Sequence, residues 1–176
     1  MGQFGHSEFV GMDKLLETLD GLSEETLLDA SCKGLQKTMT RMRDDARRNC
    51  PKDTFELQNS IHYTTRRLKS KVVGDLIASS EHAVFVEMGT GPEGEKGLGS
   101  ANVSPQMRQG VTYSGKGWTY PTGKTDPETG KAGFAYTEGM PPRPYLYPAY
   151  KEHERHVATD VRAALVQELK ASGVME

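Results

Sequence analysis

Residues 24–50 read EETLLDASCKGLQKTMTRMRDDARRNC, and this stretch decides the fold. Apolar or small side chains recur every three or four residues, at Leu28, Cys32, Leu35, Met39, Met42, Ala46 and Cys50. This spacing predicts an amphipathic helix of about seven turns. Ser23 followed by two glutamates favours a helix start, and Pro51 stops the helix.

The opposite face of this helix is basic. Its cationic residues are Lys33, Lys37, Arg41, Arg43, Arg47 and Arg48. Of Arg41, Arg43, Arg47 and Arg48, we expect at least two to face an acidic surface on another subunit or partner protein, with DNA as the second choice of partner. Three alternatives remain: an ordinary solvated face, the acidic first thirty residues folding back on it, or a nucleic-acid-binding module that uses the basic helix 33–48.

The flanking segments predict an α+β fold. We expect a short helix over residues 12–20 and strands at Leu57–Thr65 and Val72–Ala78. The segment His82–Met88 could be a strand or a short helix, which periodicity cannot separate at this length; the family resemblance described below favours the helix. A C-terminal helix is predicted from Pro148 to Ala171. The sequence thus predicts a long N-terminal amphipathic helix, a C-terminal helix and a small antiparallel sheet, in a single domain over residues 1–176 with its core in 12–88 and 140–171. The family resemblance described below implies that the helices pack on this sheet.

Residues 89–139 have a different composition, because they contain twelve of the nineteen glycines. Such a stretch cannot build a core of its own. We expect a Gly-rich loop over residues 90–112 and then an extended hairpin arm. Its short aromatic runs supply four candidate interface anchors, Trp118, Tyr120, Phe134 and Tyr136. Residues 140–148 contain four prolines and are predicted to be extended.

Several function classes find no support in these 176 residues of net charge -2. We expect no membrane span, because no run of eighteen apolar residues exists, and no signal peptide, because the first residues, MGQFGHSEFVGMD, lack both a basic flank and an apolar core of the required length. Cys32 and Cys50 would lie about 27 Å apart on one helix, too far to bridge. His153 and His156 lack a convincing third metal ligand and are expected on exposed helix surface. Without a phosphate-loop, nucleophile or metalloprotease motif, we expect no enzyme, no cofactor and no metal.

Three motifs in order give a resemblance. Residues 51–61 read PKDTFELQNSI, residues 82–91 read HAVFVEMGTG, and residues 142–149 read PRPYLYPA. The chain resembles the family of phage tail-component or neck proteins typified by the tenth gene product of a lambdoid coliphage. Its members show P-x-D-T-G-x-L-x-x-S-I, E-Y-A-x-Y-V-E-x-G-T and R-P-F-L-x-P-A segments. Phe55 replaces the usual glycine, and His82 replaces a common tyrosine.

The resemblance implies a structural virion protein at the head-proximal end of a phage tail, made in the host cytoplasm. It would help to complete or terminate the tail and join it to the head, as a homo-oligomeric, sixfold ring. Its partners would be adjacent neck, tail-terminator, tail-tube or head-closure proteins, with DNA passing through the lumen and no membrane. The motif residues would have structural roles in turns and chain reversals; they are Asp53, Thr54, Glu87, Gly89, Pro144 and Pro148.

Overall fold

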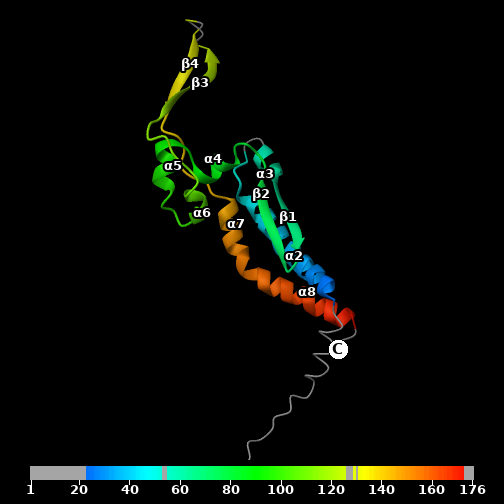
Figure 1. Cartoon of the computed structure of the whole chain (residues 1–176). Helices are drawn as coiled ribbons and strands as arrows, with labels where there is room; N and C mark the ends of the chain where they lie inside the picture. Colours follow the sequence, from blue (N-terminus) through cyan, green and yellow to red (C-terminus); the bar gives the residue numbers. More distant parts are fainter. Residues whose placement is uncertain (1–22, 53–54, 126–128, 130, 173–176) are drawn as a thin grey trace, which may run out of the picture. The chain divides into compact units, whose positions relative to one another are not determined.

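The computed structural model describes residues 23–52, 55–125, 129 and 131–172 (Figure 1). The elements follow in the order α2 (Glu24–Asn49), α3 (Glu56–Ser60), β1 (Ile61–Leu68), β2 (Lys71–Ala78), α4 (Ala83–Met88), α5 (Gly91–Gly97), α6 (Pro105–Arg108), β3 (Trp118–Thr125), β4 (Ala132–Thr137), α7 (Leu146–His153), the 3₁₀ turn η1 (Glu154–His156) and α8 (Val157–Ala171). Strands β1 and β2 form one two-stranded sheet and β3 and β4 another. The predicted α+β class is confirmed. The predicted helix over residues 12–20 lies outside the described residues.

Two compact units make up the chain. The described residues among 1–37, 65–74 and 156–176 form the first unit, and those among 38–64 and 75–155 form the second. Helix α2 and the β1–β2 sheet each contribute residues to both units. Each unit is therefore described by its own contacts.

Helix α2 follows the sequence prediction closely. The Ser23 hydroxyl accepts a hydrogen bond from the backbone N–H of Thr26 at 3.1 Å, so this serine is the expected cap. The later part of the predicted stripe is buried, at Met39, Met42, Ala46 and Cys50. The earlier members, Leu28, Cys32 and Leu35, are half-buried.

In the first unit, α2 and α8 approach each other closely at Gly34. A Cβ atom on Gly34 would lie 2.5 Å from the Cα of Val161 and 2.7 Å from the carbonyl oxygen of Asp160. Ion pairs join the same two helices, from Lys33 to Glu168 at 3.3 Å and from Lys37 to Asp160 at 3.5 Å. A residue without a side chain is therefore required where the two backbones meet.

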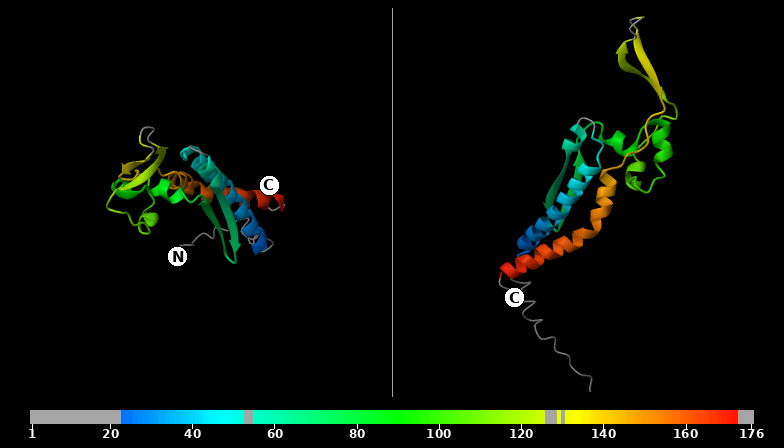
Figure 2. Two further views of the ribbon diagram at one scale, coloured as in Figure 1. Left: turned by 90° about the horizontal axis from the view of Figure 1, so that it is seen from above. Right: turned by 180° about the vertical axis from the view of Figure 1, so that it is seen from behind.

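In the second unit, a core forms where α2, β1 and α7 meet. Its buried members are Ala46, Cys50, Ile61, Tyr145 and Ala149. The hydroxyl groups of Thr40 and Tyr63 lie 3.1 Å apart and hydrogen-bond α2 to β1. Figures 1 and 2 both show the β1–β2 sheet lying along α2, so the long helix packs on a small sheet, as predicted.

The predicted strand Leu57–Thr65 is wrong at its start. Residues 56–60 form α3, and β1 begins only at Ile61. Side chains satisfy backbone groups locally: the Ser60 hydroxyl donates to the carbonyl of Leu57, and the Gln58 amide donates to the carbonyl of Arg47, both at 2.8 Å. Phe55 precedes the helix with a φ of 61°. The residue that replaces the usual glycine of the motif thus keeps a left-handed backbone.

The loop predicted over residues 90–112 contains two short helices, α5 and α6. Pro92 and Pro105 each occupy an early helical position. Ser104 caps α6, since its hydroxyl accepts from the backbone N–H of Met107 at 3.4 Å. The loop prediction, which rested on the glycine content, was therefore wrong for α5 and α6, because Pro92, Ser104 and Pro105 favour helix starts.

The predicted continuous helix Pro148–Ala171 is divided in two. Helix α7 begins earlier, at Leu146, so the extended segment predicted over 140–148 is shorter. The turn η1 then separates α7 from α8. This break coincides with the boundary between the two units, which falls between residues 155 and 156. Helix α7 belongs to the second unit and α8 to the first. The spacing of apolar residues along the sequence does not indicate such a change, so it predicted one continuous helix.

Candidate assembly site

Glu87 of the second motif (residues 82–91) is buried, and its carboxylate binds backbone groups of the third motif (residues 142–149). Its side chain has a relative exposure of 0 %. One carboxylate oxygen accepts the backbone N–H groups of Tyr145 at 2.7 Å and Leu146 at 3.0 Å, and the other accepts that of Tyr147 at 3.0 Å. Helix α7 has no capping side chain at its own N-cap residue, Tyr145. Glu87 therefore caps α7 from another element, with its negative charge at the positive end of the helix.

Backbone contacts reinforce this connection between the second and third motifs. The N–H of Arg143 donates to the carbonyl of Val86 at 2.9 Å. Thr90 and Met140 form an isolated antiparallel bridge, with N–H to oxygen distances of 2.9 and 3.2 Å. Gly89 precedes this bridge at a φ of 74°, and a Cβ there would lie 2.6 Å from the carbonyl oxygen of Met140. A residue with a side chain would strain the backbone and crowd the bridge.

The contacts of residues 86–90 with residues 140–147 form what we call the motif junction. Tyr145 belongs both to this junction and to the buried core of the second unit. Its side chain is fully buried, and among the described residues its hydroxyl has no hydrogen-bond partner. Burial raises the pKa of this phenol far above its ordinary value, and the negative charge of Glu87 raises it further. Pro144 and Pro148 flank the segment and are half-buried. Asp53 and Thr54, predicted to shape the turn of the first motif, lie outside the described residues.

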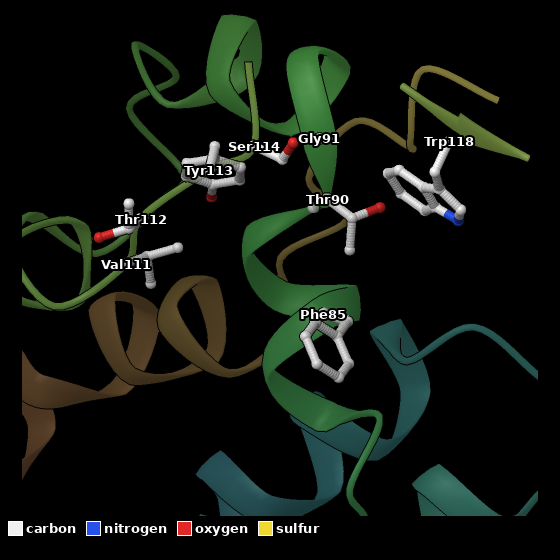
Figure 3. A pocket seen from close by; sticks show the side chains of 9 residues that line it. Phe85, Thr90, Gly91, Val111, Thr112, Tyr113, Ser114 and Trp118 are labelled. Carbon is white, nitrogen blue, oxygen red and sulfur yellow. The ribbon is translucent and has the colours of Figure 1, made fainter. Parts of the chain in front are cut away.

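A mostly apolar pocket of about 430 Å³ lies beside the junction (Figure 3). Its lining residues are Phe85, Gly89, Thr90, Gly91, Val111, Thr112, Tyr113, Ser114 and Trp118. The Tyr113 hydroxyl donates to the carbonyl of Met88 at 2.7 Å, and burial raises the pKa of this phenol. Phe85 and Trp118 are exposed at 51 and 42 %. Of these residues, sequence analysis identified Gly89 and Trp118 and missed the contribution of Phe85 and Tyr113.

The predicted aromatic hairpin forms from β3 and β4 (Figure 1). The register pairs Trp118 with Thr137, Thr119 with Tyr136, Tyr120 with Ala135 and Pro121 with Phe134. Since alternate residues of a strand point to opposite faces, Trp118 and Tyr120 share one face, and Phe134 and Tyr136 share the other. The four predicted anchors are exposed, at 42, 44, 66 and 65 % in chain order. They therefore form two exposed pairs, one on each face of the hairpin.

The four arginines predicted to face a partner differ in their contacts within the chain. The Arg47 guanidinium donates twice to the carbonyl of Ile61, at 3.0 and 2.7 Å. Arg43 pairs with Asp44 at 2.7 Å and lies over the Tyr63 ring at 5.7 Å. Arg48 pairs with Asp45, and Arg41 is half-buried. An inter-subunit role for these arginines stays a prediction, and Arg47 already has a role in joining α2 to β1.

The candidate histidine pair does not lie on exposed helix surface as expected. The His153 side chain is only 13 % exposed, and its Nε2 atom contacts a carboxylate oxygen of Asp45 on α2. His156 ends η1 and is half-buried. In the described part of the chain, no group of three or more His, Cys, Asp or Glu side chains could hold a metal ion. No helix among the described residues is long and apolar enough to cross a membrane.

These contacts define an α+β protein in which the second and third sequence motifs meet at the buried Glu87, and in which the β3–β4 hairpin carries exposed aromatic side chains. Residues 13–89 match the family model described as "Bacteriophage HK97-gp10, putative tail-component". This match agrees with the resemblance carried by the first two motifs: residues 13–89 are similar to a putative phage tail component. Neither the comparison with curated proteins nor that with solved structures gives a match.

Proposed function

We propose that the protein acts at the neck, the head-proximal end of the tail of a phage or phage-like particle. There it helps to complete or terminate the tail and to join it to the head, as a structural protein with no catalytic role. The family match over residues 13–89 supports a tail component. The resemblance of residues 82–91 and 142–149 to neck proteins supports the finer placement.

The observation that carries an assembly role is the exposure of the β3–β4 hairpin. Every residue of β3 is exposed, and Phe134 and Tyr136 on β4 are exposed at 66 and 65 %. A two-stranded hairpin is marginally stable by itself, and large aromatic side chains are frequent anchors of protein interfaces. The hairpin would gain stability and cover its aromatic side chains when it packs against a neighbouring subunit or another neck protein.

The proposed assembly is a sixfold homo-oligomeric ring with heterologous contacts between neighbours. Its other partners would be adjacent neck, tail-terminator, tail-tube or head-closure proteins. Arg41, Arg43 and Arg48 are candidates for contacts with acidic surfaces on these partners. The protein would be made in the host cytoplasm and become part of the virion.

The test replaces the aromatic pair of β4 in the full-length protein, as Phe134→Ser with Tyr136→Ser. Particles assembled with this variant are expected to accumulate as separate heads and tails, counted by electron microscopy. A matched control on the same hairpin, Lys124→Ser with Lys131→Ser, removes two exposed polar side chains and should leave joining intact. Normal joined particles from the aromatic variant would contradict the hairpin's role, and neck images with one or two copies would contradict the ring.

A further inference from the structure

The turn between β1 and β2 carries a dense positive charge in the first unit. Residues 66–71 read RRLKSK, so four of six consecutive residues are cationic. All six are exposed, and residues 65–74 contain no carboxylate. The charge therefore lies on an exposed turn with no carboxylate among its nearest neighbours in sequence.

Contacts distinguish this turn from the basic face of α2. On the helix, Lys33 and Lys37 pair with carboxylates of α8, Arg43 and Arg48 pair with neighbouring aspartates, and Arg47 binds the Ile61 carbonyl. On the turn, Arg67 pairs with Asp29. In the part of the chain that the structure describes, Lys69 and Lys71 have no ion pair. Lys33, Lys37, Arg43, Arg47 and Arg48 thus each have a contact within the protein, whereas Lys69 and Lys71 have no such ion pair among the described residues.

We propose that the β1–β2 turn, residues 66–71, contacts the phosphate backbone of double-stranded DNA. The lysines Lys69 and Lys71 supply the main contacts. Arg66 and Arg67 lie in the same exposed segment, and Arg67 is paired with Asp29. The Ser70 hydroxyl between the lysines is a further hydrogen-bond donor, of a kind common in phosphate contacts. The inference goes beyond the proposed structural role, since it assigns a nucleic-acid surface to a segment outside the hairpin.

The chemistry of the turn favours DNA over an acidic protein surface. Protein interfaces usually have a desolvated apolar or aromatic centre. The turn has no aromatic residue, and Leu68, exposed at 47 %, is its one apolar residue. A duplex instead offers one negative charge per about 1.7 Å of its axis and requires no pocket from the protein. Such a contact is independent of base sequence and sensitive to salt.

The experiment measures binding of the full-length protein to a fluorescein-labelled 20-base-pair duplex of arbitrary sequence, by anisotropy, between 50 and 200 mM NaCl. The variant is Lys69→Glu with Lys71→Glu. The charge-matched control is Lys116→Glu with Lys124→Glu, which reverses two exposed lysines outside the turn. Melting curves of all three proteins check that they are folded.

The expected result is binding that weakens with salt and does not depend on sequence. Losing two phosphate contacts should make the slope of log K against log salt shallower by about 1.8, since each contact contributes about 0.9. The control should keep the slope of the original protein. Three results would overturn the proposal: no DNA binding at 50 mM NaCl, an equal loss in the control, or tighter binding to poly-glutamate than to the duplex, which would assign the turn to an acidic protein partner.

Discussion

The motif junction around Glu87 and the β3–β4 hairpin differ in where their side chains find partners. Glu87 is fully buried, and three backbone N–H groups of this chain occupy its carboxylate. On the hairpin, β3 is exposed along its whole length, and Phe134 is 66 % exposed. The junction is complete within one chain, whereas the hairpin leaves apolar area for another molecule to cover. The difference separates residues that stabilise the fold from residues available for assembly.

The junction predicts the largest effect on stability. Glu87→Ala leaves one buried and two part-buried N–H groups at the start of α7 without an acceptor, and each unsatisfied buried group costs about 1–3 kcal/mol. We expect a loss of about 3–5 kcal/mol in the free energy of unfolding, measured by urea denaturation. Glu81→Ala, at an exposed glutamate just before α4, should change it by no more than about 0.5 kcal/mol. Equal stabilities for the two variants would show that the cap is dispensable.

A pair of glycine substitutions, at Gly34 and at Gly99, tests the close packing of α2 against α8. Gly34→Ala places a methyl group against the backbone of Val161, which cannot move as a side chain can. We expect a net loss of about 1–3 kcal/mol, although alanine favours a helix by about 1 kcal/mol. Gly99→Ala enters open space, with no atom within 4 Å of the new methyl group. Thermal unfolding of the two variants should therefore differ, and a Gly34→Ala protein that melts at or above the original temperature would exclude a tight crossing.

The local features of the fold could be predicted from the sequence. The apolar stripe from Leu28 to Cys50 and the capping residue Ser23 predicted α2, because both signals depend only on residues in or next to the helix. The hairpin was also predictable from its aromatic runs. The start of β1 was missed because the residues from Leu57 to Ser60 alternate poorly and bond their own backbone.

Features that depend on distant contacts could not be predicted. Glu87 belongs to a recognisable motif, but the N–H groups that it accepts lie 58 to 60 residues further along the chain. The contact of His153 with Asp45 spans 108 residues. The register that divides the hairpin aromatics between two faces also depends on pairing, which composition does not specify. Long-range pairing therefore decides which candidate residues are structural and which are exposed.

The arginines of α2 give a smaller effect. Arg47→Ala removes two charged hydrogen bonds to the Ile61 carbonyl, and a bond to a charged group is worth about 1.5–3 kcal/mol. We expect a loss of about 2 kcal/mol for this variant. Arg48→Ala removes an ion pair of a side chain that is 73 % exposed, worth about 0–1 kcal/mol. Chemical denaturation distinguishes the two, and an equal loss would show that the bond from α2 to β1 adds nothing beyond a surface ion pair.

The hairpin predicts the smallest effect on stability together with the largest effect on assembly. Phe134 and Tyr136 keep most of their surface in water, so replacing both with serine removes little buried area. We expect the free energy of unfolding of the isolated protein to change by about 0.5 kcal/mol or less, while the joining of heads to tails fails. Glu87→Ala should lose joining through loss of the folded protein, so its defect should be relieved at lower temperature, whereas the hairpin defect should persist. If instead the aromatic variant unfolds as readily as Glu87→Ala, the hairpin belongs to the protein's own core and the distinction between the two regions does not hold.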